Sequence, residues 1–357
     1  MRFAAAPLAL ALFAGACTPD QGLNYRKEDP IVIEDGSIRG RVCDPSGRTW
    51  LADAQAYINI VDDDGIIIDT KVAFSDVDGY WKIEPLPGER YYTVHVQYGP
   101  DELVPPEEVW VGSGDEIELE EPDCFDPLAI DVAVVTGDYD DFNLVLNEMG
   151  FANYVLVDGT DELTISAFLD DPAELAKYDI IFFNGGFVED GILYDEEDPS
   201  NTAPDTRVQN VVDYVNNGGS VYASDWAYDL VEIGWPDRAD FVGADEVPND
   251  AQQGDYDSIT AAISDTSMAE FLGTSYLDVA YDLPVWPPVE SVSSSVSVHI
   301  TGTVPYSDGL SDYTLTSVPL LYSFNAGDGK VVFSTFRVAR NSSDEMVDML
   351  QYMMYRL

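Results

Sequence analysis

The stretch from Gly218 to Glu232 contains the residues whose types and spacing most suggest chemistry. It consists of the glycine turn Gly218-Gly219, a short apolar strand, a sharp corner at Ser224-Asp225 and the start of a helix. In several α/β enzymes such a corner between strand and helix presents the nucleophile at the edge of the sheet. The sequence therefore makes Ser224 and Asp225 candidate nucleophiles.

A serine nucleophile needs a base, and the chain has two histidines, His95 and His299. Each lies in a segment that alternates as a β-strand does. By that alternation, each histidine shares a face with polar neighbours and points away from the apolar face of its strand. We therefore expect both histidines at the surface, which disfavours a Ser-His-Asp triad with Ser224.

Asp225 is open to three interpretations. Its carboxylate could act as a covalent nucleophile, or it could bind a ligand, for example a cation shared with Asp138 in the loop after the first strand of this region. An aspartate at the first turn of a helix also accepts hydrogen bonds from backbone N–H groups and suits the helix dipole. We favour this structural role, as a cap or an ion pair.

The first residues have the form of an export signal. Arg2 precedes an apolar run that is too short to span a bilayer as a mature helix, so residues 1–16 are predicted to be a signal peptide. The run ends in small residues before Cys17, a pattern that resembles the bacterial lipobox, in which the cysteine is lipidated. An ordinary signal peptide is the alternative. Residues 17–35 are then a lipidated tether, which implies a membrane anchor in a bacterial cell envelope, as an outer membrane lipoprotein facing the periplasm or the surface.

Export also bears on the other two cysteines. Cys43 and Cys124 remain as one possible pair in an oxidising compartment. We expect a disulfide between them, with two buried free thiols as the alternative. A bridge would leave neither of them for a zinc site or a thiol nucleophile.

The charge balance limits the partners. The chain has 16 basic and 67 acidic residues and a formal net charge of −51, which repels nucleic acid and anionic lipid headgroups. We expect no nucleic-acid partner. The acidic segments 62–65 and 76–79 make calcium a possible cofactor, but neither has the full ligand set of an EF-hand loop and both suit hairpin turns. We therefore expect no cofactor, and the sequence does not settle the question of a metal.

Residues 36–124 are predicted to form an all-β sandwich, because short β-branched and aromatic segments alternate with Gly, Pro and Asp turns. The expected strands are 37–42, 54–61, 66–74, 80–84, 91–98 and 116–120. The motifs GRVCDPSG (40–47), SDVDGYW (75–81) and LPG (86–88) follow in an order that resembles the carboxypeptidase regulatory-like domain, a transthyretin-type sandwich. The resemblance implies an accessory role, sometimes associated with carbohydrate, and no active site.

Residues 129–357 alternate between strands and helices. Strands are expected at 130–135, 154–157, 179–183 and 220–223, and helices at 142–149, 165–177 and 208–215, the second broken before Pro172. This alternation predicts a doubly wound, mostly parallel, flavodoxin-like α/β sheet and hence a multidomain chain. In such sheets, sites form beyond the carboxyl ends of the strands.

Three strand ends in this region resemble the class I glutamine amidotransferase-like domain. FFNGG (182–186) resembles the loop that supplies oxyanion donors, and the corner at 224–225 lies where the family has its nucleophile. GDGKVVFSTFR (327–337) resembles the strand that delivers a histidine there and in trehalose-utilisation-like domains. The resemblance implies a cleft lined by Asp138, Asn184, Gly185, Gly186, Ser224, Asp225 and Arg337.

The catalytic pair of that family is missing at the matching positions. Asp225 stands in place of the cysteine and Arg337 in place of the histidine, and a guanidinium cannot accept a proton. We expect these two side chains to form a salt bridge. The predicted function is that of a catalytically degenerate protein that binds an unknown protein or carbohydrate ligand or serves as a scaffold. The alternatives are a hydrolase with an atypical site centred on Asp225 and a carbohydrate-associated binding protein.

Overall fold

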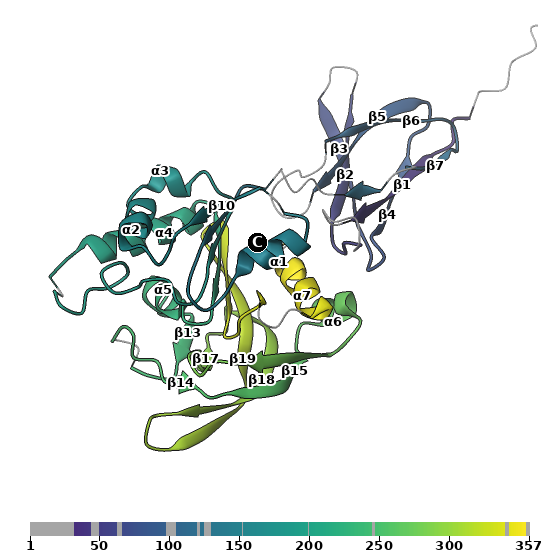
Figure 1. Ribbon diagram of the computed structural model, residues 1–357. Helices are drawn as coiled ribbons and strands as arrows, with labels where there is room; N and C mark the ends of the chain where they lie inside the picture. The colour runs from purple at the N-terminus through teal and green to yellow at the C-terminus, as the bar shows by residue number, and fades with distance from the viewer. Residues whose placement is uncertain are drawn as a thin grey trace, which may run out of the picture.

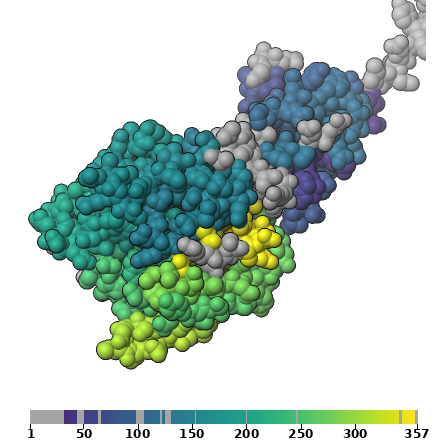
Figure 2. Space-filling model, viewed as in Figure 1, coloured from purple at the N-terminus to yellow at the C-terminus, as the bar shows by residue number. Residues whose placement is uncertain are grey.

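The computed structural model describes residues 32–43, 50–62, 66–97, 105–119, 122–124, 130–151, 153–198, 200–244, 247–339 and 343–354. Figure 1 shows them in two parts, an all-β part that contains strands β1 to β7 and a larger mixed α/β part from residue 130 onward. The same two lobes are visible in the space-filling view (Figure 2). The predicted signal peptide, Cys17 and the tether as far as residue 31 lie outside the described residues.

The all-β part consists of two four-stranded sheets. One has the order β4-β1-β7, with β8 beside β1, and the other has the order β3-β2-β5-β6. The strands are β1 (Gly36–Cys43), β2 (Gln55–Val61), β3 (Ile67–Phe74), β4 (Tyr80–Leu86), β5 (Arg90–Gln97), β6 (Glu107–Val111), β7 (Glu116–Glu118) and β8 (Asp123–Cys124). In β2 the side chains of Ala56, Ile58 and Ile60 are buried and their neighbours are partly exposed. This period of two is expected of a sheet with one face against a core.

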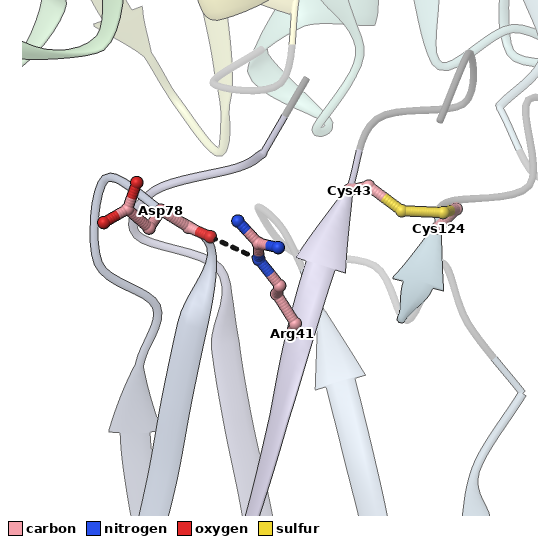
Figure 3. Close-up of a disulfide and its surroundings, with 4 residues drawn as sticks. All are labelled: Arg41, Cys43, Asp78 and Cys124. Carbon is pink, nitrogen blue, oxygen red and sulfur yellow. Dashed lines mark hydrogen bonds between the residues drawn. A yellow bond between two sulfur atoms is a disulfide. The ribbon is translucent and has the colours of Figure 1, made fainter. Parts of the chain in front are cut away.

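Cys43 and Cys124 form a disulfide between the neighbouring parallel strands β1 and β8 (Figure 3). The expected pairing is therefore present, and the alternative of two free thiols is wrong. The bridge joins residues 81 positions apart, a loop length for which chain entropy gives a stabilisation of about 4 to 5 kcal/mol. In the same region Arg41 Nε donates to the carbonyl oxygen of Asp78 at 2.7 Å, which ties β1 to the turn before β4.

The acidic segment 76–79 is a tight turn that joins β3 to β4, and because these two strands lie in different sheets it is not the expected hairpin turn. Asp76 Oδ1 accepts hydrogen bonds from the backbone N–H groups of Asp78 and Tyr80, at 3.0 and 2.9 Å. Gly79 has a φ of 77°, a conformation that favours glycine. The turn therefore accounts for this aspartate and glycine through backbone geometry. Residues 63–65 of the other acidic segment lie outside the described residues.

The α/β part is built on one ten-stranded sheet. Its parallel strands have the order β10-β9-β11-β12-β20, which is the 2-1-3-4-5 order of flavodoxin-like sheets. These strands are β9 (Val132–Val135), β10 (Tyr154–Val157), β11 (Ile180–Phe183), β12 (Ser220–Ser224) and β20 (Gly329–Ser334). Every residue of β9, β11 and β12 is buried, as expected of strands with helices on both faces.

Beyond β20 the sheet continues with antiparallel strands in the order β19-β18-β15-β16, and β14 pairs with β18. The expectation of a mostly parallel sheet is thus correct for one half of the sheet only. The additional strands are β14 (Gln253–Gly254), β15 (Asp257–Ile263), β16 (Tyr276–Tyr281), β18 (Ser297–Ser307) and β19 (Asp312–Ala326). A separate pair is formed by β13 (Ala239–Phe241) and β17 (Val289–Val292). Exposed and buried residues alternate along β16, which is typical of an antiparallel edge with one face toward water.

Helices cover both faces of the parallel strands (Figure 1). One core includes residues of α1 (Phe142–Glu148), α6 (Thr266–Leu272) and α7 (Asp344–Met354). The other includes residues of α2 (Glu162–Leu169), α3 (Pro172–Leu175), α4 (Ala203–Asn216) and α5 (Tyr228–Gly234). The predicted break before Pro172 is confirmed, since Pro172 opens α3 and Asp171 caps it by accepting from Ala173 N. Among the described residues, no helix combines the length and the apolar character that crossing a membrane requires.

Candidate functional site

The corner after β12 has the backbone of a strained strand-to-helix turn. Ser224 ends the strand, Asp225 has a φ of 52°, and α5 begins at Tyr228. A left-handed conformation is uncommon for a residue with a side chain and needs support from its surroundings. Asp225 N donates to the carbonyl oxygen of Ser334 at 2.8 Å, and Ala227 N donates to that of Ser224 at 3.0 Å. The neighbouring strand β20 therefore holds the corner in place.

The glycine loop after β11 lies directly against this corner. A Cβ atom on Gly185 would lie 2.8 Å from Asp225 Cβ and 2.9 Å from Trp226 N, so a side chain would not fit there. Gly186 has a φ of 84°. Asn184 is fully buried and its Nδ2 donates to the carbonyl oxygen of Asp140 at 3.1 Å. The ends of β11 and β12, which the sequence analysis identified, are thus packed together. The contact is so close that only glycine fits at position 185.

The predicted approach of Arg337 to Asp225 is confirmed. Arg337 Nε lies 3.5 Å from Asp225 Oδ2, and the side chains are 6% and 2% exposed. The guanidinium also donates from Nη1 to the carbonyl oxygen of Tyr139 at 3.1 Å, and its Nη2 contacts Asp282 Oδ1. Arg337 therefore bridges the corner, the loop after β9 and the end of β16.

Burial sets the electrostatics of this region. It raises the pKa of Asp225 well above its ordinary value, while Arg337 opposes the shift and Asp140 adds to it. Burial also raises the pKa of Asp140 to about 6, although its carboxylate accepts from the N–H groups of Val338 and Ala339 at 3.0 and 3.1 Å. The guanidinium of Arg337 is thus a positive partner of both Asp140 and Asp225. This arrangement favours a structural role for Asp225 over that of a nucleophile.

The remaining predicted cleft residues differ in exposure. Ser224 is fully buried, and its Oγ has no hydrogen-bond partner among the described residues. Asn184 Oδ1 and Asp225 Oδ1 are likewise unpartnered there. Asp138 is exposed, and the carboxyl that interacts electrostatically with Asp225 is Asp140, which the sequence did not single out. In the described part of the chain, no group of three or more His, Cys, Asp or Glu residues has the arrangement of a metal site.

The histidines differ from one another. His95 is partly exposed and stacks on Tyr57, with ring centroids 4.7 Å apart. The expectation of a surface position is wrong for His299, which is 7% exposed. The reason is a β-bulge: Val298 pairs with Tyr322 and Ile300 with Leu321, so His299 is an extra residue in β18. A bulge breaks the alternation on which the prediction rested.

No family model and no curated protein matches the chain. Among solved structures, a cytoplasmic protein from Salmonella typhimurium is similar at 15% identity, over 63% of this chain and 97% of that one, with a TM-score of 0.40. A ThuA-like protein from Bacteroides uniformis is similar at 9% identity, over 64% of this chain and 91% of that one, with a TM-score of 0.40. PurLQS from Thermotoga maritima is similar at 10% identity, over 63% and 97%, with a TM-score of 0.36. These likenesses assign no residue and no activity to this chain.

Proposed function

We propose that this protein is an exported, membrane-anchored lipoprotein whose amidotransferase-like corner serves binding or scaffolding and not catalysis. The observation that carries the proposal is the buried pair of Asp225 and Arg337 at the corner. Glutamine hydrolysis needs a thiolate and a base, and neither an aspartate at this depth nor a guanidinium supplies them. The unknown ligand is a protein or a carbohydrate.

Three features support the rest of the proposal. The two sheets of residues 36–124 suit a β-sandwich of the carboxypeptidase regulatory-like type (Figure 1). The disulfide between Cys43 and Cys124 suits an oxidising compartment of the cell envelope. The sequence before Cys17 suits lipidation, which would anchor a protein to the outer membrane through its acyl chains.

The anchor is tested with Cys17→Ser in the full chain expressed in a Gram-negative host. The variant should move from the membrane pellet to the soluble periplasmic fraction, because acyl chains are the proposed source of membrane affinity. Thr18→Ala serves as the matched control, since it changes the residue next to Cys17 without removing the lipid or the disulfide. A processed Cys17→Ser protein that still sediments with membranes would contradict the lipoprotein assignment.

The absence of catalysis at the corner is tested with L-glutamine, by measuring glutamate release from the purified protein and from Asp225→Asn. Neither should release glutamate above the rate without protein. Glutamate release that Asp225→Asn abolishes, with the circular dichroism spectrum unchanged, would overturn the proposal.

A further inference from the structure

An acid, a base and a hydroxyl are aligned in a second place, away from the corner. Asp265 Oδ2 lies 2.8 Å from His299 Nδ1, and His299 Nε2 lies 2.7 Å from Ser323 Oγ. The hydrogen bond from His299 is the largest cause that lowers the pKa of Asp265, to about 2, so this carboxylate is ionised and can only accept. In the neutral imidazole the proton therefore lies on Nδ1, and Nε2 accepts the hydroxyl proton of Ser323.

Each member of this array is fixed by a different element. Asp265 is the N-cap of α6, where Oδ1 accepts from Ser267 N at 2.9 Å, and Oδ2 also accepts from the hydroxyl of Tyr352 in α7 at 3.2 Å. His299 is the bulge residue of β18, and Ser323 lies in the neighbouring strand β19. Bulges often redirect a side chain toward a site, and here the bulge turns His299 toward Ser323. The geometry is thus held by rigid strands and a helix end.

The array lines a pocket of about 510 Å³. His299 and Ser323 are each 7% exposed, so each presents only a small part of its surface to the pocket. Lys330, near the start of β20, also lines it, whereas Ser334 at the end of the same strand contacts the corner. The pocket therefore lies toward the amino end of β20, whereas Asp225 lies near its carboxyl end, and the two sites are separate.

The pocket differs in charge from the rest of the protein. Two basic residues, Arg238 and Lys330, line it together with Asp265, although the chain has only 16 basic residues against 67 acidic ones. In three other pockets formed by described residues, every charged lining residue is acidic. Arg238 is placed by a hydrogen bond from Nη1 to Ser295 Oγ at 2.5 Å. A site that carries extra positive charge favours a substrate with a negative charge.

We propose that this pocket is a serine hydrolase site for carboxylic esters whose acyl group carries a negative charge. Ser323 Oγ attacks the ester carbonyl carbon while His299 Nε2 takes its proton, and Asp265 positions the imidazole and stabilises the imidazolium. The tetrahedral adduct collapses with cleavage of the ester C–O bond, and His299 returns the proton to the leaving alcohol. Water then attacks the acyl-Ser323 ester in the same way, so ester and water give acid and alcohol. Arg238 and Lys330 bind the negative charge of the acyl group.

The nucleophile is tested with a fluorophosphonate probe on the whole protein, followed by intact mass and peptide mapping. We expect one phosphonyl group per chain, on Ser323, and none on Ser323→Ala. Ser258→Ala, which removes an exposed hydroxyl from β15, is the matched control and should label as the wild type does. An unlabelled wild type, or a label that persists on Ser323→Ala, would overturn the proposal.

The base is tested by the rate of the same labelling. His299→Asn should slow it by about 100-fold or more, because Nε2 no longer accepts the serine proton. His95→Asn, the matched change in β5, should leave the rate unchanged. Equal rates in wild type and in a folded His299→Asn protein would show that the array is structural.

The substrate charge is tested with mono-p-nitrophenyl succinate and p-nitrophenyl acetate. The wild type should hydrolyse the succinate ester with the higher kcat/KM, and Arg238→Gln should lower that preference about 10-fold, the effect of losing one charged hydrogen bond. A preference for the acetate ester in the wild type, or an unchanged preference in Arg238→Gln, would contradict the assigned substrate class.

Discussion

Arg337 connects the corner to two other segments of the α/β part. Its guanidinium contacts Asp225, Asp282 and the carbonyl oxygen of Tyr139 from a position that is 6% exposed. Removing a buried cation leaves the polar atoms of its partners buried without a partner. The resulting loss of folding free energy usually exceeds the net stabilisation that the ion pair itself provides. The residue is therefore a sensitive probe of the corner.

We expect Arg337→Met to lower the free energy of unfolding by about 3 to 5 kcal/mol, because Asp225, Asp282 and the carbonyl oxygen of Tyr139 lose their common buried partner. Urea denaturation followed by tryptophan fluorescence measures the change. Arg39→Met is the matched control, since the pair of Arg39 and Glu118 is 55% and 58% exposed and its loss should leave the urea midpoint unchanged. Adding Asp225→Asn to Arg337→Met should recover part of the loss. Equal midpoints for the two arginine variants would contradict a supporting role for Arg337.

The approach of Asp225 and Arg337 was predicted because the resemblance to amidotransferase-like domains implies that the ends of their two strands lie side by side, and β12 and β20 are indeed neighbours. The sequence did not predict the buried position of His299. A β-bulge adds one residue to a strand, and the sequence of a strand with alternating residues does not show where that extra residue lies. Asp140 was missed for a related reason. It lies two residues after Asp138 in an acidic loop, and only the backbone shows which carboxylate turns inward.

At the scale of elements, the contact between the glycine loop after β11 and the corner after β12 is closest at Gly185. A Cβ atom there would lie within 3.0 Å of Ser224 O as well as of Asp225 Cβ and Trp226 N. Two of these atoms belong to the backbone, so the two strand ends would have to separate to admit a methyl group.

We expect Gly185→Ala to destabilise the fold by about 1 to 3 kcal/mol through this overlap. Gly234→Ala at the end of α5 is the matched control, because the nearest atom to its added Cβ is Val212 Cγ2 at 3.4 Å and alanine suits a helix. Thermal unfolding by differential scanning calorimetry compares the two. A Gly185→Ala protein as stable as Gly234→Ala would show that the strand ends are not in firm contact.

The parallel strands were predictable as elements because they are short, continuous apolar runs between helical patterns. The antiparallel strands from β14 to β19 were not, because their order depends on pairings between distant segments. β18, for example, pairs with β14, β15 and β19 at once. The proposed hydrolase site of Asp265, His299 and Ser323 lies in that antiparallel half of the sheet. The sequence-based expectation placed the site at the carboxyl ends of the parallel strands and therefore did not include these residues.

At the scale of the whole molecule, acidic side chains occur both on the surface and in the core. The formal net charge of −51 implies repulsion between surface carboxylates, which salt screens. Buried carboxyl groups behave differently. Burial raises the pKa of Asp140 and Asp229 to about 6 and that of Asp225 and Glu189 well above the ordinary value.

These raised pKa values set the sign of the pH dependence. A carboxyl group whose pKa is higher in the folded protein than in the unfolded chain binds its proton more tightly when folded, so its contribution to stability is complete below the unfolded pKa of about 4 and is lost as pH rises through the folded value. The contribution lost from Asp140, whose pKa is raised to about 6, is on the order of 2 to 3 kcal/mol. We therefore expect the free energy of unfolding of the α/β part to be higher at pH 5 than at pH 8, and urea denaturation at the two pH values measures the difference.

The dependence of stability on salt concentration distinguishes the contribution of the buried carboxyl groups from that of the surface charge. In 1 M NaCl the Debye length falls to about 3 Å, so repulsion among exposed carboxylates is largely removed while buried groups are screened much less. The protein should be more stable in 1 M NaCl than in 0.1 M at both pH values, and the difference between pH 5 and pH 8 should persist. Asp225→Asn should reduce that difference, since the amide cannot ionise, whereas Asp278→Asn at an exposed position of β16 should not. A pH dependence that disappears in 1 M NaCl would assign it to the surface charge and contradict the role of the buried carboxyl groups.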